Sequence, residues 1–205
     1  DLWGMAAGIW RVMTGRKDPA ARLAAQLVLG TLPVIAAGYT LNHYMPGGIR
    51  SLTVVAWATL GFGIVLLITD KVGMTIRRIE HLGFGDAFVI GMAQILALIP
   101  GTSRSGITMS AARILGFERA DAARFSMLLS IPTILGAGTL KGLELYNSGN
   151  ADLTAAAIMA AAMAFITALI AITLLMAWLR RATFTPFVIY RVILGGILLG
   201  FAYGL

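Results

Sequence analysis

The sequence contains no cysteine, which excludes disulfide bonds, thiolate nucleophiles and thiolate metal sites. Histidine is almost as scarce: His43 and His81 are the two histidines, and they are too far apart in the chain to form a histidine-rich metal cage. Charge is also scarce, because only 12% of the 205 residues are charged, about half of the roughly 25% in an ordinary soluble domain. Disorder is therefore excluded, and a soluble globular domain is disfavoured.

Hydrophobic residues make up 59% of the chain, and 16 Lys and Arg against 9 Asp and Glu give a formal net charge of +7. Such a balance elsewhere suggests a nucleic-acid partner. Here the basic residues lie between apolar stretches of about 20 residues, a pattern typical of the cytoplasmic anchors of membrane helices. We therefore expect a bilayer and no nucleic acid as the surroundings of this chain.

Apolar stretches long enough to cross a hydrocarbon core of about 30 Å occur five times. They predict membrane-spanning helices over residues 22–41, 52–69, 125–140, 153–178 and 184–201, the third being short and containing Pro132. Residues 2–13 are predicted to be the end of a further helix, and the start at Asp1 suggests a piece of a longer protein. The prediction is an all-α, polytopic membrane bundle that forms a single domain over residues 1–205.

Residues 87–115 are apolar but unsuited to a simple span. Two apolar halves, residues 87–99 and 107–115, are each too short to cross and are separated by Pro-Gly-Thr-Ser-Arg-Ser-Gly. Irregular backbone at membrane depth is tolerated only where protein or a watery cavity satisfies its polar groups. The pattern therefore predicts a re-entrant helix–loop–helix.

The distribution of basic residues supports this interpretation independently. The basic clusters flank alternate ends of the spans and comprise Arg11, Arg16, Lys17, Arg22, Lys71, Arg77, Arg78, Arg119, Arg124, Arg180 and Arg181. The opposite loops, residues 42–51 and 141–152, contain only Arg50 and Lys141 as basic residues. All clusters fall on the cytoplasmic face only if the segment 87–115 enters and leaves on the same side.

The loop of the re-entrant segment is rich in hydrogen-bond donors and flexible backbone; its residues are Pro100, Gly101, Thr102, Ser103, Arg104, Ser105 and Gly106. Free amides at a helix N-terminus, together with the guanidinium of Arg104, make a site for a phosphate group. Burying Arg104 at membrane depth costs about 2.5–3.5 kcal/mol on insertion scales, so a bound anion or a buried carboxylate should offset the cost. Alternatively, Ser103 and Ser105 cap the following helix while Arg104 pairs with a structural carboxylate or reaches the surface.

Other polar residues allow a functional and a structural interpretation each. Gln94 suits substrate binding or, more commonly, helix-to-helix hydrogen bonding. Asp86, Glu118 and Asp121 flank the re-entrant segment and suit either metal binding or helix capping and charge balance. Arg191 interrupts the last span and requires a partner. Gly195, Gly196, Gly200 and Gly204 favour close helix packing and are compatible with a homodimer.

These residues resemble the second half of the undecaprenyl-diphosphate phosphatases, the bacitracin-resistance family of bacteria. The resemblance is carried by residues 94–106 (QILALIPGTSRSG), 116–119, 122–132, 185–187, 190–191 and 29–33, and so covers nearly the whole chain. It implies hydrolysis of undecaprenyl diphosphate to undecaprenyl phosphate and inorganic phosphate, which recycles the lipid carrier of peptidoglycan synthesis in the bacterial plasma membrane. It also implies half of an inverted-repeat architecture.

The resemblance implies roles for the loop residues as well. Arg104 and Ser103 are the catalytic candidates, with Arg104 neutralising the diphosphate and the transition state. Gly101, Thr102, Ser103, Arg104, Ser105, Gly106 and Gln94 are the candidates for substrate binding. Mg²⁺ or Ca²⁺ is the implied cofactor.

The sequence departs from the family in one respect. The family's first re-entrant loop carries a glutamate-rich motif and a PxSSTGH stretch, which supply carboxylates for the metal and a nucleophile or base, and neither run occurs here. The metal ligands therefore stay unknown, and we expect these 205 residues alone to be inactive; Arg104-dependent hydrolysis by them would overturn this expectation.

Two alternative functions remain at this stage. A transporter or flippase of a phosphorylated lipid would use the same loop to bind an anion without cleaving it. A structural membrane subunit would lose stability but no binding when Arg104 is replaced.

Overall fold

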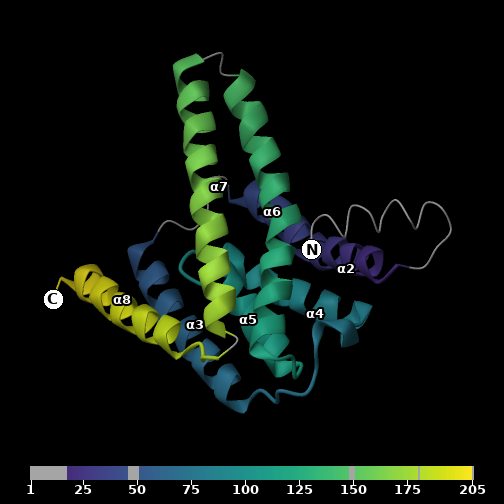
Figure 1. Ribbon diagram of the computed structural model, residues 1–205. Helices are drawn as coiled ribbons and strands as arrows, with labels where there is room; N and C mark the ends of the chain where they lie inside the picture. The colour runs from purple at the N-terminus through teal and green to yellow at the C-terminus, as the bar shows by residue number, and fades with distance from the viewer. Residues whose placement is uncertain (1–17, 46–50, 148–150, 180, 205) are drawn as a thin grey trace.

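A computed structural model describes residues 18–45, 51–147, 151–179 and 181–204. Apart from one isolated bridge between Arg77 and Phe117, the regular structure of these residues is helical. The helix predicted over residues 2–13 lies outside the described ranges. In chain order the helices are α2 (Pro19–Tyr44), α3 (Leu52–Val72), η1 (Ile79–His81), α4 (Phe84–Gln94), η2 (Ile95–Leu98), α5 (Arg104–Ile114), α6 (Arg119–Asn147), α7 (Ala151–Leu179) and α8 (Thr185–Tyr203) (Figure 1).

Five of these helices, α2, α3, α6, α7 and α8, are long and apolar enough to cross a membrane. The all-α polytopic prediction is therefore confirmed. Helix α6 extends beyond the predicted span of residues 125–140 at both ends, and Lys141 lies within it instead of in a loop. Pro132 does not end α6. Next to it, the hydroxyls of Ser130 and Thr133 donate to the carbonyls of Met127 and Leu129, on either side of the Leu128 carbonyl that Pro132 leaves without its usual donor.

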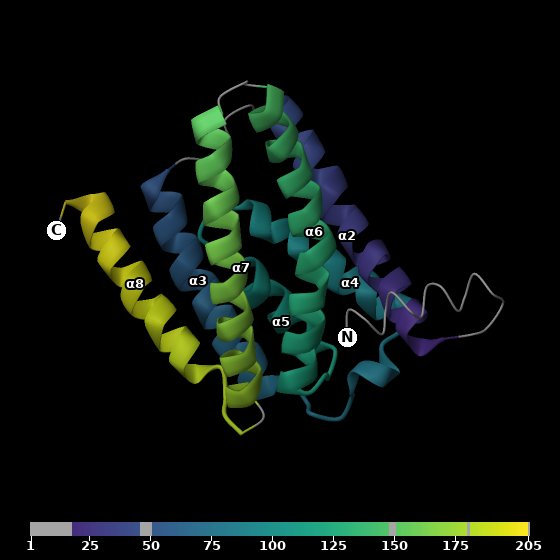
Figure 2. The same cartoon turned by 45° about the horizontal axis from the view of Figure 1, so that its top comes forward.

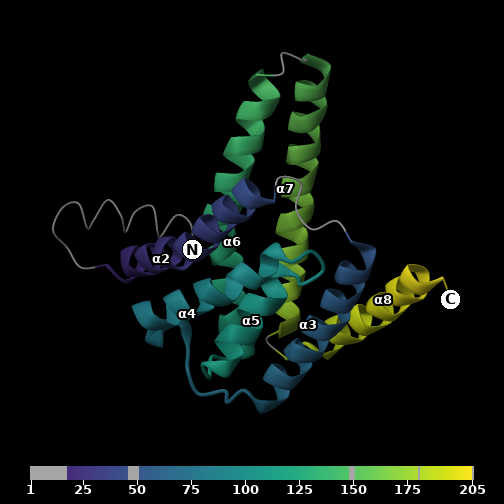
Figure 3. The same ribbon diagram turned by 180° about the vertical axis from the view of Figure 1, so that it is seen from behind.

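The short helices α4 and α5 enter and leave the bundle at the same end. Arg77 joins them there: its guanidinium donates to Asp86 in the first turn of α4 and to the carbonyl of Leu115 directly after α5. Between these points the chain turns back at residues 99–103, beside the first half of α3 (Figure 3). The segment is therefore re-entrant, as its two short apolar halves predict.

Helix α5 occupies the centre of the bundle although its sequence is polar. Residues 106–113 are all buried, and α5 contacts α3, α4 and α6. Thr108 of α5 and Ser126 of α6 share a hydrogen bond of 2.6 Å, which joins the two helices by hydroxyl groups instead of apolar packing. Helix α7, in contrast, packs mainly on α6 (Figures 1 and 2) and has no buried residue in its most apolar window, as expected of a helix that faces lipid.

A buried ion cluster fixes the end of the bundle at which α3 terminates. Asp70, 3% exposed, accepts from Arg119 Nε at 2.6 Å and lies 3.6 Å from Arg113 Nε. Arg113 also donates to several carbonyls at the end of α3, including that of Gly73 at 2.7 Å. The amide of Phe184 donates to the other carboxylate oxygen of Asp70 at 3.4 Å. Asp70 thus joins α3 to α5, to α6 and to the start of α8.

Of the described basic residues, Arg22, Lys71, Arg77, Arg78, Arg113 and Arg119 lie at this same end of the bundle, whereas Arg104, Lys141 and Arg191 lie elsewhere. Arg22 donates to the carbonyl of Leu82 before α4, Arg78 pairs with Glu118 before α6, and Arg119 reaches Asp70. We call this the basic end. The positive-inside rule predicts that this end faces the cytoplasm.

Candidate functional site

The loop between η2 and α5 has an unusual backbone at Ser103. Its φ of 66° lies in the left-handed region, which costs a non-glycine residue about 1–3 kcal/mol and persists only where the surroundings impose it. In this conformation Ser103 Oγ accepts a hydrogen bond of 3.2 Å from the amide of Gly106 and caps α5. The Ser105 hydroxyl lies 3.5 Å from that of Ser103. The capping role is therefore present for Ser103, and both hydroxyls lie at the positive end of the α5 dipole.

Gly101 brings the loop into direct contact with α3. Its φ is 95°, and a Cβ at this position would lie 2.3 Å from the carbonyl oxygen of Val55, so only glycine fits. Its own carbonyl accepts from the hydroxyl of Thr59 at 3.3 Å and from Arg191 Nη2 at 2.8 Å. Helices α3 and α8 therefore hold the turn of the loop in place.

Arg191 of α8 is the second cation of the loop. Its side chain is buried, and Nε and Nη2 donate to the carbonyl of Thr59 at 3.3 and 3.2 Å, while Nη2 also reaches Gly101. The partner that the sequence requires is thus a pair of backbone carbonyls, and no carboxylate of the described residues neutralises the positive charge. Nη1 lies 3.3 Å from the place of a Cβ on Gly106, which directs the free side of the guanidinium toward the start of α5.

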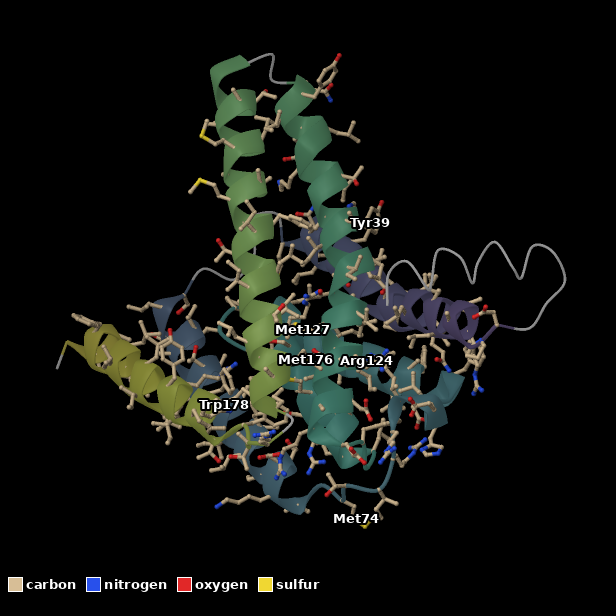
Figure 4. All side chains as sticks on the ribbon, in the orientation of Figure 1. Tyr39, Met74, Arg124, Met127, Met176 and Trp178 are labelled. Atoms are coloured by element: carbon tan, nitrogen blue, oxygen red, sulfur yellow. The ribbon has the colours of Figure 1, made fainter. Side chains whose placement is uncertain are left out.

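A cavity of about 490 Å³ opens beside this group. Its polar end consists of the loop and Arg191, and its other walls are apolar side chains from α3, α5, α6, α7 and α8; the lining residues are Thr59, Leu66, Gly101, Ser103, Ser105, Gly106, Met109, Met127, Leu175, Phe184, Phe187, Tyr190, Arg191 and Leu194. Figure 4 labels Met127, which lies where α6 and α7 pass each other. The described lining contains no Asp, Glu or His.

Three predicted binding residues lie outside this lining. Arg104 Nη1 and Thr102 Oγ1 are buried without a hydrogen-bond partner among the described residues. No carboxylate of the described chain pairs with Arg104, so the structural alternative of a buried ion pair finds no support there. Gln94 donates to the hydroxyl of Thr133 at 3.5 Å, as expected for helix-to-helix hydrogen bonding. The roles of these three residues in substrate binding stay predictions.

The acidic residues around the re-entrant segment have structural partners. Asp86 caps α4 through the amide of Gly83 and pairs with Arg77 at 2.6 Å. Burial tends to raise the pKa of the Asp86 carboxyl, but hydrogen bonds from Arg77 and Gly83 and the charge of Arg77 hold that pKa below its ordinary value. Glu118 pairs with Arg78 at 3.3 Å. Across the described ranges no three Asp, Glu, His or Cys side chains gather as metal ligands, so these residues do not fit a resident metal ion.

The depth of the loop follows from its contacts with α3. Thr59 and Gly101 are hydrogen-bonded, and Thr59 is the eighth residue of the 21-residue helix. At 1.5 Å per residue the loop therefore lies about 10 Å from the start of α3 and about 20 Å from its basic end. The loop is thus nearer to the face opposite the basic end.

Sequence comparisons agree with these features. A family model described as "Bacitracin resistance protein BacA" matches residues 1–197. The chain is 51% identical over 204 residues to "Undecaprenyl-diphosphatase 1" of Rhodospirillum rubrum, which covers 99% of this chain and 72% of the relative. It is 48% identical to "Undecaprenyl-diphosphatase" of Dinoroseobacter shibae and 45% identical to that of Ruegeria pomeroyi, each over 205 residues, 99% of this chain and 77% of the relative.

Proposed function

Because the chain belongs to the family of the bacitracin resistance protein BacA, we propose that it hydrolyses undecaprenyl diphosphate to undecaprenyl phosphate and inorganic phosphate. The reaction returns the lipid carrier to peptidoglycan synthesis and thereby confers resistance to bacitracin. The membrane is the bacterial plasma membrane, which the protein crosses several times.

The observation that carries this proposal is the polar end of the cavity. The hydroxyls of Ser103 and Ser105, the N-terminus of α5 and the unneutralised guanidinium of Arg191 converge on one place, next to apolar walls. Hydroxyls, a helix N-terminus and a guanidinium bind phosphate oxygens, and a dry surrounding strengthens their electrostatic effect. Apolar walls are also compatible with the prenyl chain of the lipid.

The chemistry breaks one phosphoanhydride bond. The oxygen of a water molecule forms a bond to the terminal phosphorus, and the bond from that phosphorus to the bridging oxygen breaks, so that undecaprenyl phosphate leaves. In our proposal Ser103 and Ser105 bind the diphosphate, while Arg104 and Arg191 stabilise the negative charge of the transition state. Gly101 and Gly106 let the backbone approach the phosphates, and Thr102 and Gln94 complete the binding residues.

Mg²⁺ or Ca²⁺ stays a proposal that rests on the family. The described residues do not fit a resident metal, since the cavity offers hydroxyls and a guanidinium and no carboxylate. We therefore assign no step of the reaction to a metal ion. For the same reason no described residue is assigned as the base that activates water.

A homodimer is a further proposal. The sequence suggests Gly195 as a residue of the dimer interface, but in the structure Gly195 packs against α3 of the same chain. A Cβ at this position would lie 2.8 Å from the Cβ of Leu60. Gly196 has no neighbour within 4 Å of such a Cβ among the described residues and leaves part of α8 open to a second copy. Cross-linking of a Gly196→Cys variant in the membrane tests this proposal. A yield of disulfide-linked dimer no higher than that of a variant with cysteine at a lipid-exposed position of α7 would contradict it.

The proposed reaction is tested with the purified complete gene product in detergent. We expect release of inorganic phosphate from undecaprenyl diphosphate with formation of undecaprenyl phosphate, measured by a phosphate assay and by mass spectrometry of the lipid. A folded protein that binds the lipid without releasing phosphate would contradict the proposal. Transport of the intact lipid across vesicle membranes would then favour the flippase.

Replacing Arg191 with lysine tests the arrangement of the site. Lysine keeps the positive charge but cannot donate from a planar fork to Thr59 and Gly101 together. We expect kcat/KM for phosphate release to fall roughly tenfold, equivalent to about one hydrogen bond of a charged group. Lys141→Arg, an exposed change at the far end of α6, is the control. Unchanged kcat/KM in Arg191→Lys would show that the fork is dispensable.

A further inference from the structure

A second cavity, of about 390 Å³, lies at the basic end, separate from the cavity beside Ser103 and Arg191, which we call the catalytic cavity. It is bounded by the segment after α3, the start of α6 and the turn between α7 and α8; its lining residues are Thr75, Glu118, Arg119, Ala120, Leu179, Arg181, Ala182 and Thr183. We call it the cytoplasmic cavity. None of these residues lines the first cavity, and no step of the proposed hydrolysis uses them.

Two guanidinium groups give the cytoplasmic cavity its charge. Arg181 is exposed, and no side-chain partner of it is found in the described structure. Arg119 reaches Asp70 with Nε at 2.6 Å but keeps 31% of its side chain exposed. Glu118, the acidic residue of the lining, is compensated by Arg78 at 3.3 Å. Asp70 is shared between Arg113 and Arg119, and Glu118 pairs with Arg78, so the arginines at this cavity outnumber the carboxylates that neutralise them.

The surroundings of the cavity are those of a membrane interface. The polar hydroxyls of Thr75 and Thr183 line it together with the apolar Leu179. Trp178, 50% exposed, lies at the same end of α7 and donates to the carbonyl of Thr183 at 3.4 Å (Figure 4). Tryptophan is typical of this depth. Farther from this end along α7 most exposed side chains are apolar, among them Leu174, which is 66% exposed, while Thr167 and Thr173 are exposed polar residues whose hydroxyls donate to carbonyls of the helix itself.

We propose that the cytoplasmic cavity binds the headgroup of an anionic phospholipid. The phosphodiester oxygens would accept from Arg181 and Arg119, the hydroxyl of Thr75 would donate to a remaining headgroup oxygen, and the acyl chains would lie along the exposed apolar side of α7. The hydroxyl of Thr183 is not counted as a donor to the lipid, because it donates to Thr185 Oγ1 at 2.8 Å. Basic pockets between helices on the cytoplasmic side are suited to such headgroups, because anionic lipids give that leaflet a negative surface potential. A zwitterionic lipid would bind more weakly, since its ammonium group would be repelled by the same arginines.

The experiment measures lipid binding to the complete gene product in detergent by native mass spectrometry. We expect phosphatidylglycerol to bind more tightly than phosphatidylcholine and to raise the melting temperature. Arg181→Gln should weaken phosphatidylglycerol binding about tenfold, the loss expected for one charged hydrogen bond. Ala182→Phe, which fills the cavity without changing charge, should have a similar effect. Lys71→Gln removes one charge from the same end but lies outside the lining, so it should leave binding within about twofold.

Three results would overturn the proposal. One is equal affinity for the two lipids. Another is an equal loss in Lys71→Gln and Arg181→Gln, which would indicate only general attraction to a basic surface. The third is a rise in melting temperature with inorganic phosphate alone that matches the rise with phosphatidylglycerol, which would make free phosphate the ligand. Phosphate release by the enzyme is not a readout here, so the result does not depend on the proposed reaction.

Discussion

The Arg104→Ala variant is expected to release phosphate from undecaprenyl diphosphate about 10²- to 10³-fold more slowly than the unaltered protein, the usual effect of removing one preorganised donor from a transition state. Arg104 follows the residue that caps α5, within the loop that Gly101 and Arg191 hold against α3. Its Nη1 is buried with no protein partner in the described part of the chain. A bound phosphate would supply the missing acceptor.

Stability separates this role from a structural one. A buried donor without a partner destabilises a folded protein, and removing it relieves that cost. We therefore expect Arg104→Ala to melt at the same temperature as the unaltered protein or higher, while activity falls. Such an opposition of activity and stability is typical of functional residues. A lower melting temperature with normal activity would instead make Arg104 a structural residue.

Two variants serve as controls for this experiment. Arg104→Lys restores the charge without the fork and should recover part of the activity. Lys141→Ala removes an exposed charge near the C-terminal end of α6, away from the loop, and should change neither the rate of phosphate release nor the melting temperature. Full activity in Arg104→Ala would remove this residue from the proposed mechanism.

The Asp70→Ala variant is expected to lose about 3–5 kcal/mol of the free energy of unfolding, because it leaves buried arginine charge without its counterion. Arg113 is 1% exposed and Arg119 also depends on Asp70, so both partners are affected. Removing the Asp70 carboxylate also leaves the backbone amide of Phe184 without its acceptor. Phe184 lies directly before α8 and lines the catalytic cavity. Activity should fall with stability. Chemical denaturation in detergent measures the change.

Glu144→Ala is the matched control for Asp70→Ala. Glu144 also pairs with a cation, Lys141, at 2.7 Å, but both side chains are mostly exposed. Exposed pairs contribute no more than about 1 kcal/mol, so this variant should unfold close to the unaltered protein. If the two variants lost the same stability, the buried cluster would not be what holds the basic end together.

Several features of the fold can be predicted from the sequence because each depends on local pattern. The length of the apolar stretches gives the spanning helices, and Pro100 and Gly101 between two short apolar halves give the re-entrant turn. The positions of the basic residues indicate that the re-entrant segment enters and leaves on the same side of the membrane. Ser103 and Arg104 can be predicted as anion-binding candidates for the same reason, because hydroxyls and a guanidinium at the start of a helix are a local pattern that does not depend on the residues packed around it.

Other features depend on residues that are distant in the chain. The partners of Arg191 are backbone carbonyls at positions 59 and 101, and a carbonyl leaves no signal in a sequence. Asp70 appears there as one acidic residue after a span, and only packing shows that it joins Arg113, Arg119 and Phe184. Helix α6 is longer than the span that the sequence predicts, because Pro132 suggests an interruption in the sequence but lies inside a continuous helix in the structure.

The sequence by itself therefore determines that this protein is a helical membrane bundle with a re-entrant loop, and it predicts that the loop binds an anion, since a bilayer requires helices and permits a broken one only around a polar site. Tertiary structure alone decides which groups surround that loop. It brings Arg191 to the loop, leaves Arg104 without a protein partner in the described residues, and pairs Asp86 and Glu118 with arginines at the basic end, away from the loop. The reason is physical: a charge in an apolar interior is satisfied by whatever group packing places within hydrogen-bond distance, and local sequence does not encode that distance.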